Sequence, residues 1–136
     1  MQIEYKINPL ITVHDLIEIL DKSTLGLRRP LSDLKAMGSM LAHANYYIGA
    51  YENGQLVGLV RAMTDFVYTT YLADLAVDEK YQHQGIGKEL IKILKINIPK
   101  AKLILLAAPA AEAYYPKIGM QKHSHCYYID DVADII

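Results

Sequence analysis

The sequence has no tryptophan, a single phenylalanine and a single cysteine, Cys126. One cysteine excludes a disulfide within the chain and suits a reducing compartment. Basic residues are not in excess, because 14 Lys and Arg stand against 15 Asp and Glu. The chain therefore lacks the positive charge that nucleic-acid binding usually requires.

Long apolar segments are also missing. No apolar run reaches the roughly 18 residues of a membrane-spanning helix. The first residues show no basic region followed by an apolar one, so they do not predict a signal peptide. We therefore expect a cytoplasmic protein that has neither a membrane nor a nucleic acid as its partner.

What is present favours one packed domain over residues 1–136. Hydrophobic residues make up 52% of the 136-residue chain and charged residues 21%, which is enough for a core and too apolar for disorder. Thr12 and Asp15 have the spacing of a capping box at the start of an amphipathic helix. Asn53-Gly54, between two apolar runs, predicts a tight β-hairpin.

The most informative segment is a glycine-rich turn between an apolar run at 71–77 and an amphipathic run at 89–98. Gln82, Gly85 and Gly87 give it the form Gln-x-x-Gly-x-Gly. Glycines let the backbone approach a ligand closely, and a helix that begins there points free N–H groups at an anion. The segment therefore predicts a phosphate or pyrophosphate site.

Two familiar phosphate-binding motifs do not fit this turn. A P-loop requires a glycine at the position of Gln82 and a serine or threonine at that of Glu89. A dinucleotide fingerprint requires glycine or alanine where this chain has Leu90. The site is therefore of another kind.

The order of expected elements is β, α, α, β, β, β, α, β, α, β, which predicts an α+β domain with a mixed, mostly antiparallel central sheet flanked by helices. The strand–helix–strand crossover makes 71–77 and 103–106 parallel neighbours. A short helix over 110–118 is ended by Gly119. Residues 121–129 are expected to supply one or two closing strands.

This order of elements, with two motifs placed in it, resembles the GNAT N-acetyltransferase superfamily. The first is the Gln82–Gly85–Gly87 turn. The second is the segment 113–120, an aromatic-tyrosine pair followed by an apolar-Gly-apolar end. The resemblance implies an acetyltransferase with a GNAT-like fold that uses acetyl-CoA as cosubstrate and no metal. It would transfer acetyl directly, in a ternary complex, to a primary amine of a small molecule or peptide.

The resemblance also implies roles for individual residues. The tyrosine at position 115, Tyr115, would protonate the leaving sulfur, and Asp74 is the best side-chain candidate to accept the amine proton. The strand end and the turn would bind the coenzyme through Leu75, Ala76, Val77, Gln82, His83, Gln84, Gly85, Ile86, Gly87 and Lys88. Arg28, Arg29 and Tyr71 are the candidates for the acceptor side, where arginines could bind a carboxylate or phosphate.

The sequence is also compatible with other functions. Ala108 occupies the position of a common family asparagine, and Pro116 directly follows Tyr115. Both departures suit a non-catalytic acyl-CoA-binding sensor or regulatory module, or an interaction domain that keeps only the fold. His123 and His125 lack a third ligand, so no metal site is expected. A homodimer is plausible because open sheet edges seek partners.

Overall fold

The computed structural model describes residues 2–136, which form two compact units. The first unit ends at Leu106, and the second covers Ala107–Ile136. The sheet and the three longest helices all belong to the first unit. The single domain expected over 1–136 therefore has its core within the residues before Ala107.

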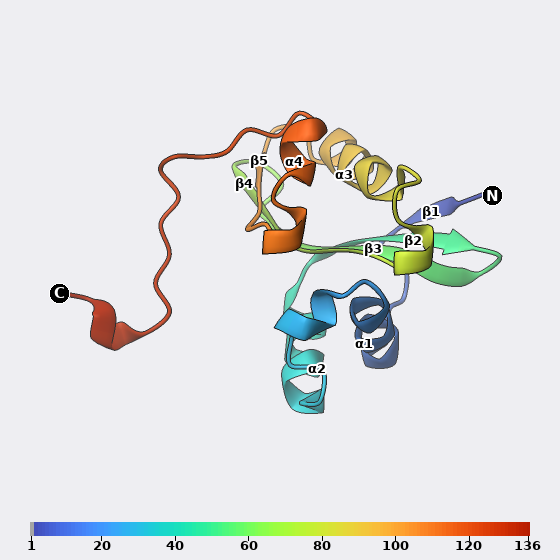
Figure 1. Cartoon of the computed structure of the whole chain (residues 1–136), viewed down its shortest axis with the longest axis horizontal. Helices are drawn as coiled ribbons and strands as arrows, with labels where there is room; N and C mark the ends of the chain where they lie inside the picture. The colour runs from blue at the N-terminus through green and yellow to red at the C-terminus, as the bar shows by residue number, and fades with distance from the viewer. Residues whose placement is uncertain (1) are drawn as a thin grey trace. The chain divides into compact units, whose positions relative to one another are not determined.

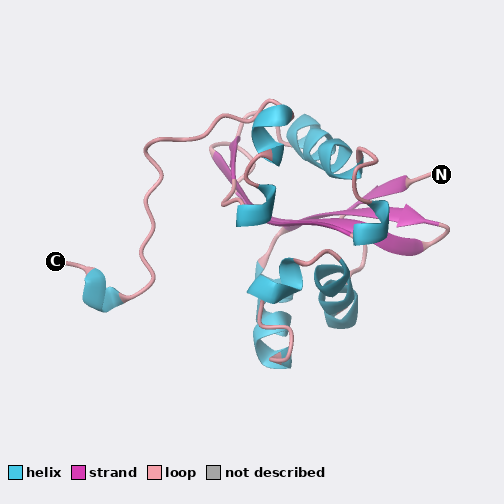
Figure 2. Ribbon diagram, in the orientation of Figure 1, coloured by secondary structure: helices cyan, strands magenta, loops and turns pink. Residues whose placement is uncertain are grey.

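A five-stranded sheet with the spatial order β1-β2-β3-β4-β5 organises the first unit (Figures 1 and 2). Neighbours from β1 to β4 are antiparallel, and β5 runs parallel to β4. The predicted α+β class, the mixed sheet and the parallel crossover are confirmed. The strands are β1 (Glu4–Ile7), β2 (Tyr46–Glu52), β3 (Gln55–Thr64), β4 (Thr69–Val77) and β5 (Lys102–Ile104).

Helices cover both faces of this sheet, as Figure 1 shows. Helices α1 (Val13–Lys22) and α2 (Leu34–His43) share a buried cluster with Leu59 of β3 and Ala76 of β4. Helix α3 (Ile86–Asn97) packs on the opposite face, where a Cβ at Gly58 would lie 3.2 Å from atoms of Ile86 and Leu90. Burial on both faces explains why the central strands are almost continuously apolar.

Local sequence signals determine several boundaries of these elements. The Thr12 hydroxyl accepts from the N–H of Asp15, and the Asp15 carboxylate accepts from the N–H of Thr12, which completes the predicted capping box. Asn53 and Gly54 both have positive φ, 50° and 81°, as a type I′ hairpin requires. Two 3₁₀ turns, η1 (Leu25–Arg28) and η2 (Glu79–Tyr81), lead into the α1–α2 loop and the glycine-rich turn.

The second unit contains only short helical segments: η3 (Pro109–Ala111), α4 (Tyr114–Lys117) and η4 (Val132–Asp134). The helix expected over 110–118 is therefore divided into η3 and α4. Gly119, with φ of 99°, ends α4, and its N–H donates to Pro116 while that of Met120 donates to Tyr115. This pair of bonds is a Schellman motif, as the glycine predicted.

The closing strands expected over 121–129 are wrong. The structure has no strand there, and Tyr127 and Tyr128 are exposed. The N–H of His125 donates to its neighbour His123, which is a local bond rather than a ladder bond. Aromatic residues favour strands only where a neighbouring strand supplies backbone partners and a surface to pack on, and this segment has neither in the described chain.

No helix within residues 2–136 is both long enough and apolar enough to cross a membrane.

Candidate functional site

Strand β4 has a neighbour on its β5 side along only part of its length. The parallel ladder pairs Thr69 with Lys102 and ends where Tyr71 meets Ile104. Residues 72–77 of β4 continue beyond it and pair with β3 alone in the described chain. On that side the backbone of residues 72–77 has no strand partner in the described chain, so an extended ligand could bond to it.

A bulge in β4 decides which side chains face α2. Arg61 of β3 pairs with Asp74, whereas the next residue, Ala62, pairs with Leu72, so Ala73 is the extra residue. Paired residues share a face, and the extra residue shifts the alternation. Tyr71 and Asp74, three positions apart, therefore lie on the same face as Arg61. Leu75 and Val77 lie on the opposite face.

The glycine-rich turn has the backbone geometry of an anion site. His83 and Gly85 both have positive φ, 64° and 86°. The first backbone bond into α3 is Glu89 N–H to Gly85 C=O, at 3.0 Å, so the N–H groups of residues 86–88 have no helical acceptor. A Cβ at Gly85 would meet nothing within 4 Å. This open cradle has the free backbone donors that a phosphate or pyrophosphate group requires.

Side-chain bonds fix this turn to the sheet. The Gln82 side-chain amide donates to the Val77 carbonyl at 2.9 Å, and the Tyr81 hydroxyl donates to Glu52 at 2.6 Å. The Gln82 side chain therefore links the turn to the end of β4. Because the side chain makes this bond, the main-chain groups of the turn remain available to a ligand. His83, Gln84 and Lys88 are exposed, so they are available to a bound molecule.

Asp74 lies at the centre of a buried ion cluster. Its side chain is 0% exposed, and each of its oxygens accepts from a different arginine. Arg29 Nε donates to Oδ1 at 2.8 Å, and Arg61 Nε donates to Oδ2. Arg29 also donates to the carbonyl of Ala73, the bulge residue. Both oxygens of the carboxylate predicted to act as a base are therefore engaged in ion pairs.

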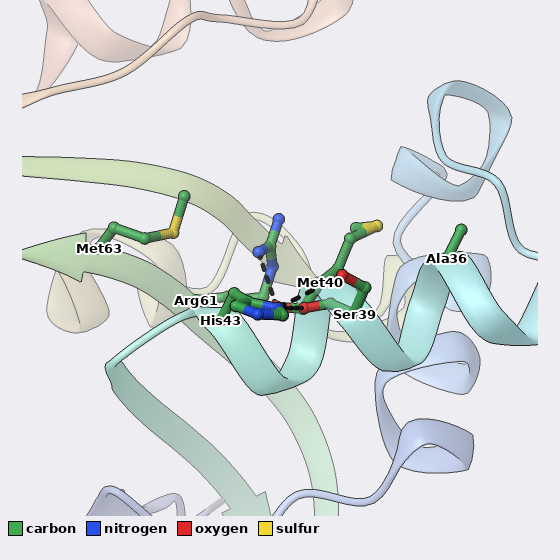
Figure 3. Close-up of a pocket in the computed structure, with 6 residues that line it drawn as sticks. All are labelled: Ala36, Ser39, Met40, His43, Arg61 and Met63. Carbon is green, nitrogen blue, oxygen red and sulfur yellow. Dashed lines mark hydrogen bonds between the residues drawn. The ribbon is translucent and has the colours of Figure 1, made fainter.

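A cavity of about 480 Å³ opens beside this cluster, between α2 and β3 (Figure 3). Its volume falls within the range of small-molecule sites, roughly 300–1,000 Å³. One charged side chain, Arg61, reaches it from the sheet. The lining residues are Ala36, Ser39, Met40, His43, Arg61 and Met63.

The predicted acceptor residues have different surroundings. Arg28 is exposed, whereas Arg29 is half-buried and bonded to Asp74. Tyr71 lies opposite Met63, which lines the cavity. Arg61 was missed, because a lone arginine in an apolar run predicts no particular role until its strand partner is known.

Tyr115 lies in the second unit, in the first turn of α4. Pro116 therefore falls where no helical N–H bond is lost. Tyr114 packs edge-on against Tyr115, with ring centroids 5.3 Å apart. Burial, with a smaller contribution from Tyr114, raises the pKa of Tyr115, so its phenol keeps its proton at neutral pH. A protonated phenol is the form that an acid catalyst requires.

His123 and His125 lie close, with ring centroids 5.8 Å apart. Within residues 2–136, however, no group of three or more His, Cys, Asp or Glu side chains is placed to bind a metal.

The family model for the acetyltransferase (GNAT) domain matches residues 22–133, which include the glycine-rich turn and α4. The chain belongs to the GNAT acetyltransferase family. GNAT acetyltransferases use acetyl-CoA, so the family assignment agrees with the open side of β4 and the cradle after it.

Similarity to curated proteins supports the same family. The chain is 31% identical over 127 residues to the histone acetyltransferase TAP1 of Glycine max, covering 82% of this chain and 52% of that protein. It is 27% identical over 117 residues to the uncharacterized N-acetyltransferase ycf52 of Gracilaria tenuistipitata var. liui, covering 82% and 63%. The chain thus spans about half to two thirds of the length of these relatives.

Solved structures share the fold at low sequence identity. A GNAT-family acetyltransferase from Streptococcus pneumoniae TIGR4 matches with a TM-score of 0.72 and 20% identity, covering 95% of this chain and 98% of that one. A ribosomal-protein-alanine N-acetyltransferase from Brucella melitensis biovar Abortus 2308 matches with a TM-score of 0.72 and 19% identity, covering 96% and 100%.

Proposed function

We propose that this chain transfers an acetyl group from acetyl-CoA to a primary amine of a small molecule or peptide, directly within a ternary complex. The observation that carries the proposal is the continuity of two backbone features. Residues 72–77 of β4 have an open side, and the chain then enters a turn whose N–H groups at 86–88 have no acceptor in the described chain. A long ligand with an amide arm and a pyrophosphate could bind both, with the arm along β4 and the pyrophosphate at the turn.

The open part of β4 would also polarise the thioester. A backbone N–H near Leu75 can donate to the carbonyl oxygen as negative charge develops on it during amine attack. Because the strand is fixed by β3 on its other side, this donor needs little rearrangement. We infer that Leu75, Ala76 and Val77 bind the acyl arm mainly through their main chain.

Tyr115 is the proposed acid for the departing sulfur. Its raised pKa keeps the phenol protonated, so it has a proton to give to the thiolate as the carbon–sulfur bond breaks. The phenolate that remains regains its proton from solvent once the products leave.

Asp74 as the general base remains a prediction. Its ion pairs with Arg29 and Arg61 favour a positioning role, because a proton that arrives at either oxygen would displace a guanidinium donor. We propose that the cluster fixes the α1–α2 loop and the bulge next to the unpaired part of β4, and that water accepts the amine proton.

The test is a titration of acetyl-CoA, free CoA and NAD into the wild-type chain and two Gly85 variants. Gly85→Glu places bulk and negative charge in the cradle, whereas Gly85→Asn tolerates the left-handed backbone and adds no charge. We expect binding of acetyl-CoA and CoA but not NAD, a loss in Gly85→Glu, and a smaller effect in Gly85→Asn. Unchanged acetyl transfer by Gly85→Glu would contradict the proposal.

A second candidate function is a non-catalytic acyl-CoA sensor. It is favoured by the engagement of both Asp74 oxygens, which leaves that carboxylate without a free acceptor. Binding of acetyl-CoA without thiol release across a broad panel of amines would support the sensor, and turnover of any amine in the panel would exclude it.

A further inference from the structure

We propose that the acceptor carries an anionic group, a carboxylate or a phosphate, in addition to its amine, and that this group binds Arg61 in the cavity between α2 and β3. The inference rests on the proposed acetyl transfer and specifies its acceptor. Arg61, which the sequence did not single out, would thus recognise the anionic group of the acceptor.

The charge balance of the cluster leaves a positive charge beside the cavity. Arg29 and Arg61 contribute two guanidinium groups, and Asp74 contributes one carboxylate. The cavity lining contains no Asp or Glu that could balance the remaining charge. An anion entering the cavity would therefore meet one uncompensated cation and no carboxylate among the lining side chains.

Arg61 has a donor to spare for this anion. Its Nε donates to Asp74 and its Nη1 to the Met40 carbonyl at 3.2 Å, whereas Nη2 has no partner within residues 2–136. The side chain is only 8% exposed. Within residues 2–136, every fully enclosed side-chain nitrogen and oxygen has a hydrogen-bond partner. Because Nη2 has no such partner, it is not fully enclosed, and Arg61 lines the cavity.

The rest of the lining suits a small organic anion. Met40 and Met63 flank Arg61 in Figure 3 and provide apolar walls, while Ser39 and His43 lie on the α2 side. His43 Nδ1 lies 2.8 Å from the Ser39 carbonyl, which makes Nδ1 the protonated nitrogen of this ring.

The cavity also lies beside the strand that would bind the acetyl donor. Arg61 pairs with Asp74 and Met63 pairs with Tyr71, so two lining residues are direct neighbours of β4. A single small acceptor could thus place its amine at the open side of β4 and its anionic group on Arg61. This arrangement requires both charges on one compact molecule or at one chain end.

A direct test does not need turnover. Methyl groups of ¹³C-labelled methionine are observed by NMR while acetate or inorganic phosphate is added to the chain at constant ionic strength, with chloride as the reference salt. We expect the methyl signals of Met40 and Met63 to shift. Met37, which is fully buried in the neighbouring core cluster, serves as an internal control. Equal shifts with chloride, or no shift at all, would overturn the proposal.

Three variants separate anion binding from stability. Arg61→Gln removes the cation, and Ala36→Phe fills the cavity but leaves the Arg29–Asp74–Arg61 cluster intact. Lys35→Gln removes an exposed positive charge from α2 outside the lining. We expect Arg61→Gln and Ala36→Phe to lose the shifts and Lys35→Gln to keep them. Retention of the shifts by a folded Ala36→Phe would contradict the assignment.

Matched acceptors then identify the anion and test turnover. Amino acids are compared with their amides, and phosphoethanolamine with ethanolamine, so the members of each pair differ in the anionic group. For the preferred anionic acceptor, we expect KM in Arg61→Gln to rise about tenfold to a hundredfold, the loss typical of a charged hydrogen bond, while the affinity for acetyl-CoA is retained. Turnover without any preference for the anionic members refutes this inference alone. Absence of acetyl-CoA binding in the wild type refutes the proposed acetyl transfer instead.

Discussion

Arg61 and Asp74 lie opposite each other on β3 and β4, and their side chains form an ion pair inside the protein. The pair joins the two strands to α2 and to the α1–α2 loop, because Arg61 also donates to the Met40 carbonyl of α2 and Asp74 also accepts from Arg29. A charged contact at this place orients the α1–α2 region relative to the strand that would bind the acyl arm.

Replacement of Asp74 by asparagine should destabilise the chain. The amide of asparagine is neutral and has one acceptor oxygen, so it cannot form charged hydrogen bonds to both arginines. The buried Arg61 and the half-buried Arg29 then lose their counter-charge. Removing one partner from a buried ion pair costs about 3–5 kcal/mol. Urea unfolding should show this loss, whereas Asp130→Asn, at an exposed position of the second unit, should not. Normal stability with a strongly reduced kcat would instead support Asp74 as the general base.

The side chain of Gln82 should affect coenzyme affinity indirectly. Its amide donates to the carbonyl of Val77 and ties the turn to β4. We expect Gln82→Leu to weaken acetyl-CoA binding about tenfold, the effect of one lost hydrogen bond plus a misplaced cradle. Gln84→Leu is the matched control, because Gln84 is exposed and its side chain has no bond in the described chain. Titration calorimetry measures the acetyl-CoA affinity of the two variants, and equal affinities would contradict this role of Gln82.

Removal of the Tyr115 hydroxyl should lower kcat with little change in acetyl-CoA affinity. General acid catalysis typically contributes about a hundredfold or more, so Tyr115→Phe should lose a factor of that order. Because burial raises the pKa of Tyr115, its acid form should persist, and kcat should not fall through deprotonation of this phenol below about pH 10. Tyr114→Phe is the paired control. Equal kcat values for the two variants would remove Tyr115 from the mechanism.

Asp65 should give the folded chain a pH-dependent stability. Its carboxylate accepts from the backbone N–H groups of Val67, Tyr68 and Thr69 in the β3–β4 turn. These bonds lower the pKa of Asp65 below its ordinary value of 3.8. Its contribution is therefore complete above that value and is lost as pH falls through the lower, folded pKa.

Thermal unfolding of Asp65→Asn across pH provides the check. The variant should melt below the wild type at pH 7, and the difference should shrink as the pH falls below 3.8. A difference that stays constant down to the lowest pH would show that the charge of this carboxylate is not involved. Asp130→Asn again controls for net charge.

The features that could be predicted from sequence depend on neighbours along the chain. The capping box joins residues three apart, the hairpin needs positive φ at Asn53 and Gly54, and the glycine-rich turn needs its left-handed residue at Gly85. Each signal is complete within a few residues. The parallel pairing of β4 with β5 followed from the general rule for strand–helix–strand crossovers.

The ion cluster could not be predicted in this way. Arg29 lies 45 residues from Asp74, and Arg61 lies 13 residues from it on a different strand. The register between β3 and β4 also depends on the bulge at Ala73. The residue types around this position do not predict a bulge. The expected strands over 121–129 failed for a related reason, because β-structure requires partners that the segment itself does not contain.

The partial pairing of β4 has a consequence for amide exchange. Up to Tyr71 the strand lies inside the sheet, and beyond it the same strand is an edge. In deuterated water, the outward-pointing amides of residues 72–77 should take up deuterium faster than those that bond to β3. A molecule bound along this side would slow deuterium uptake at those outward-pointing amides to which it bonds. Mass spectrometry of the resulting peptides would thus locate a bound coenzyme without any label or turnover.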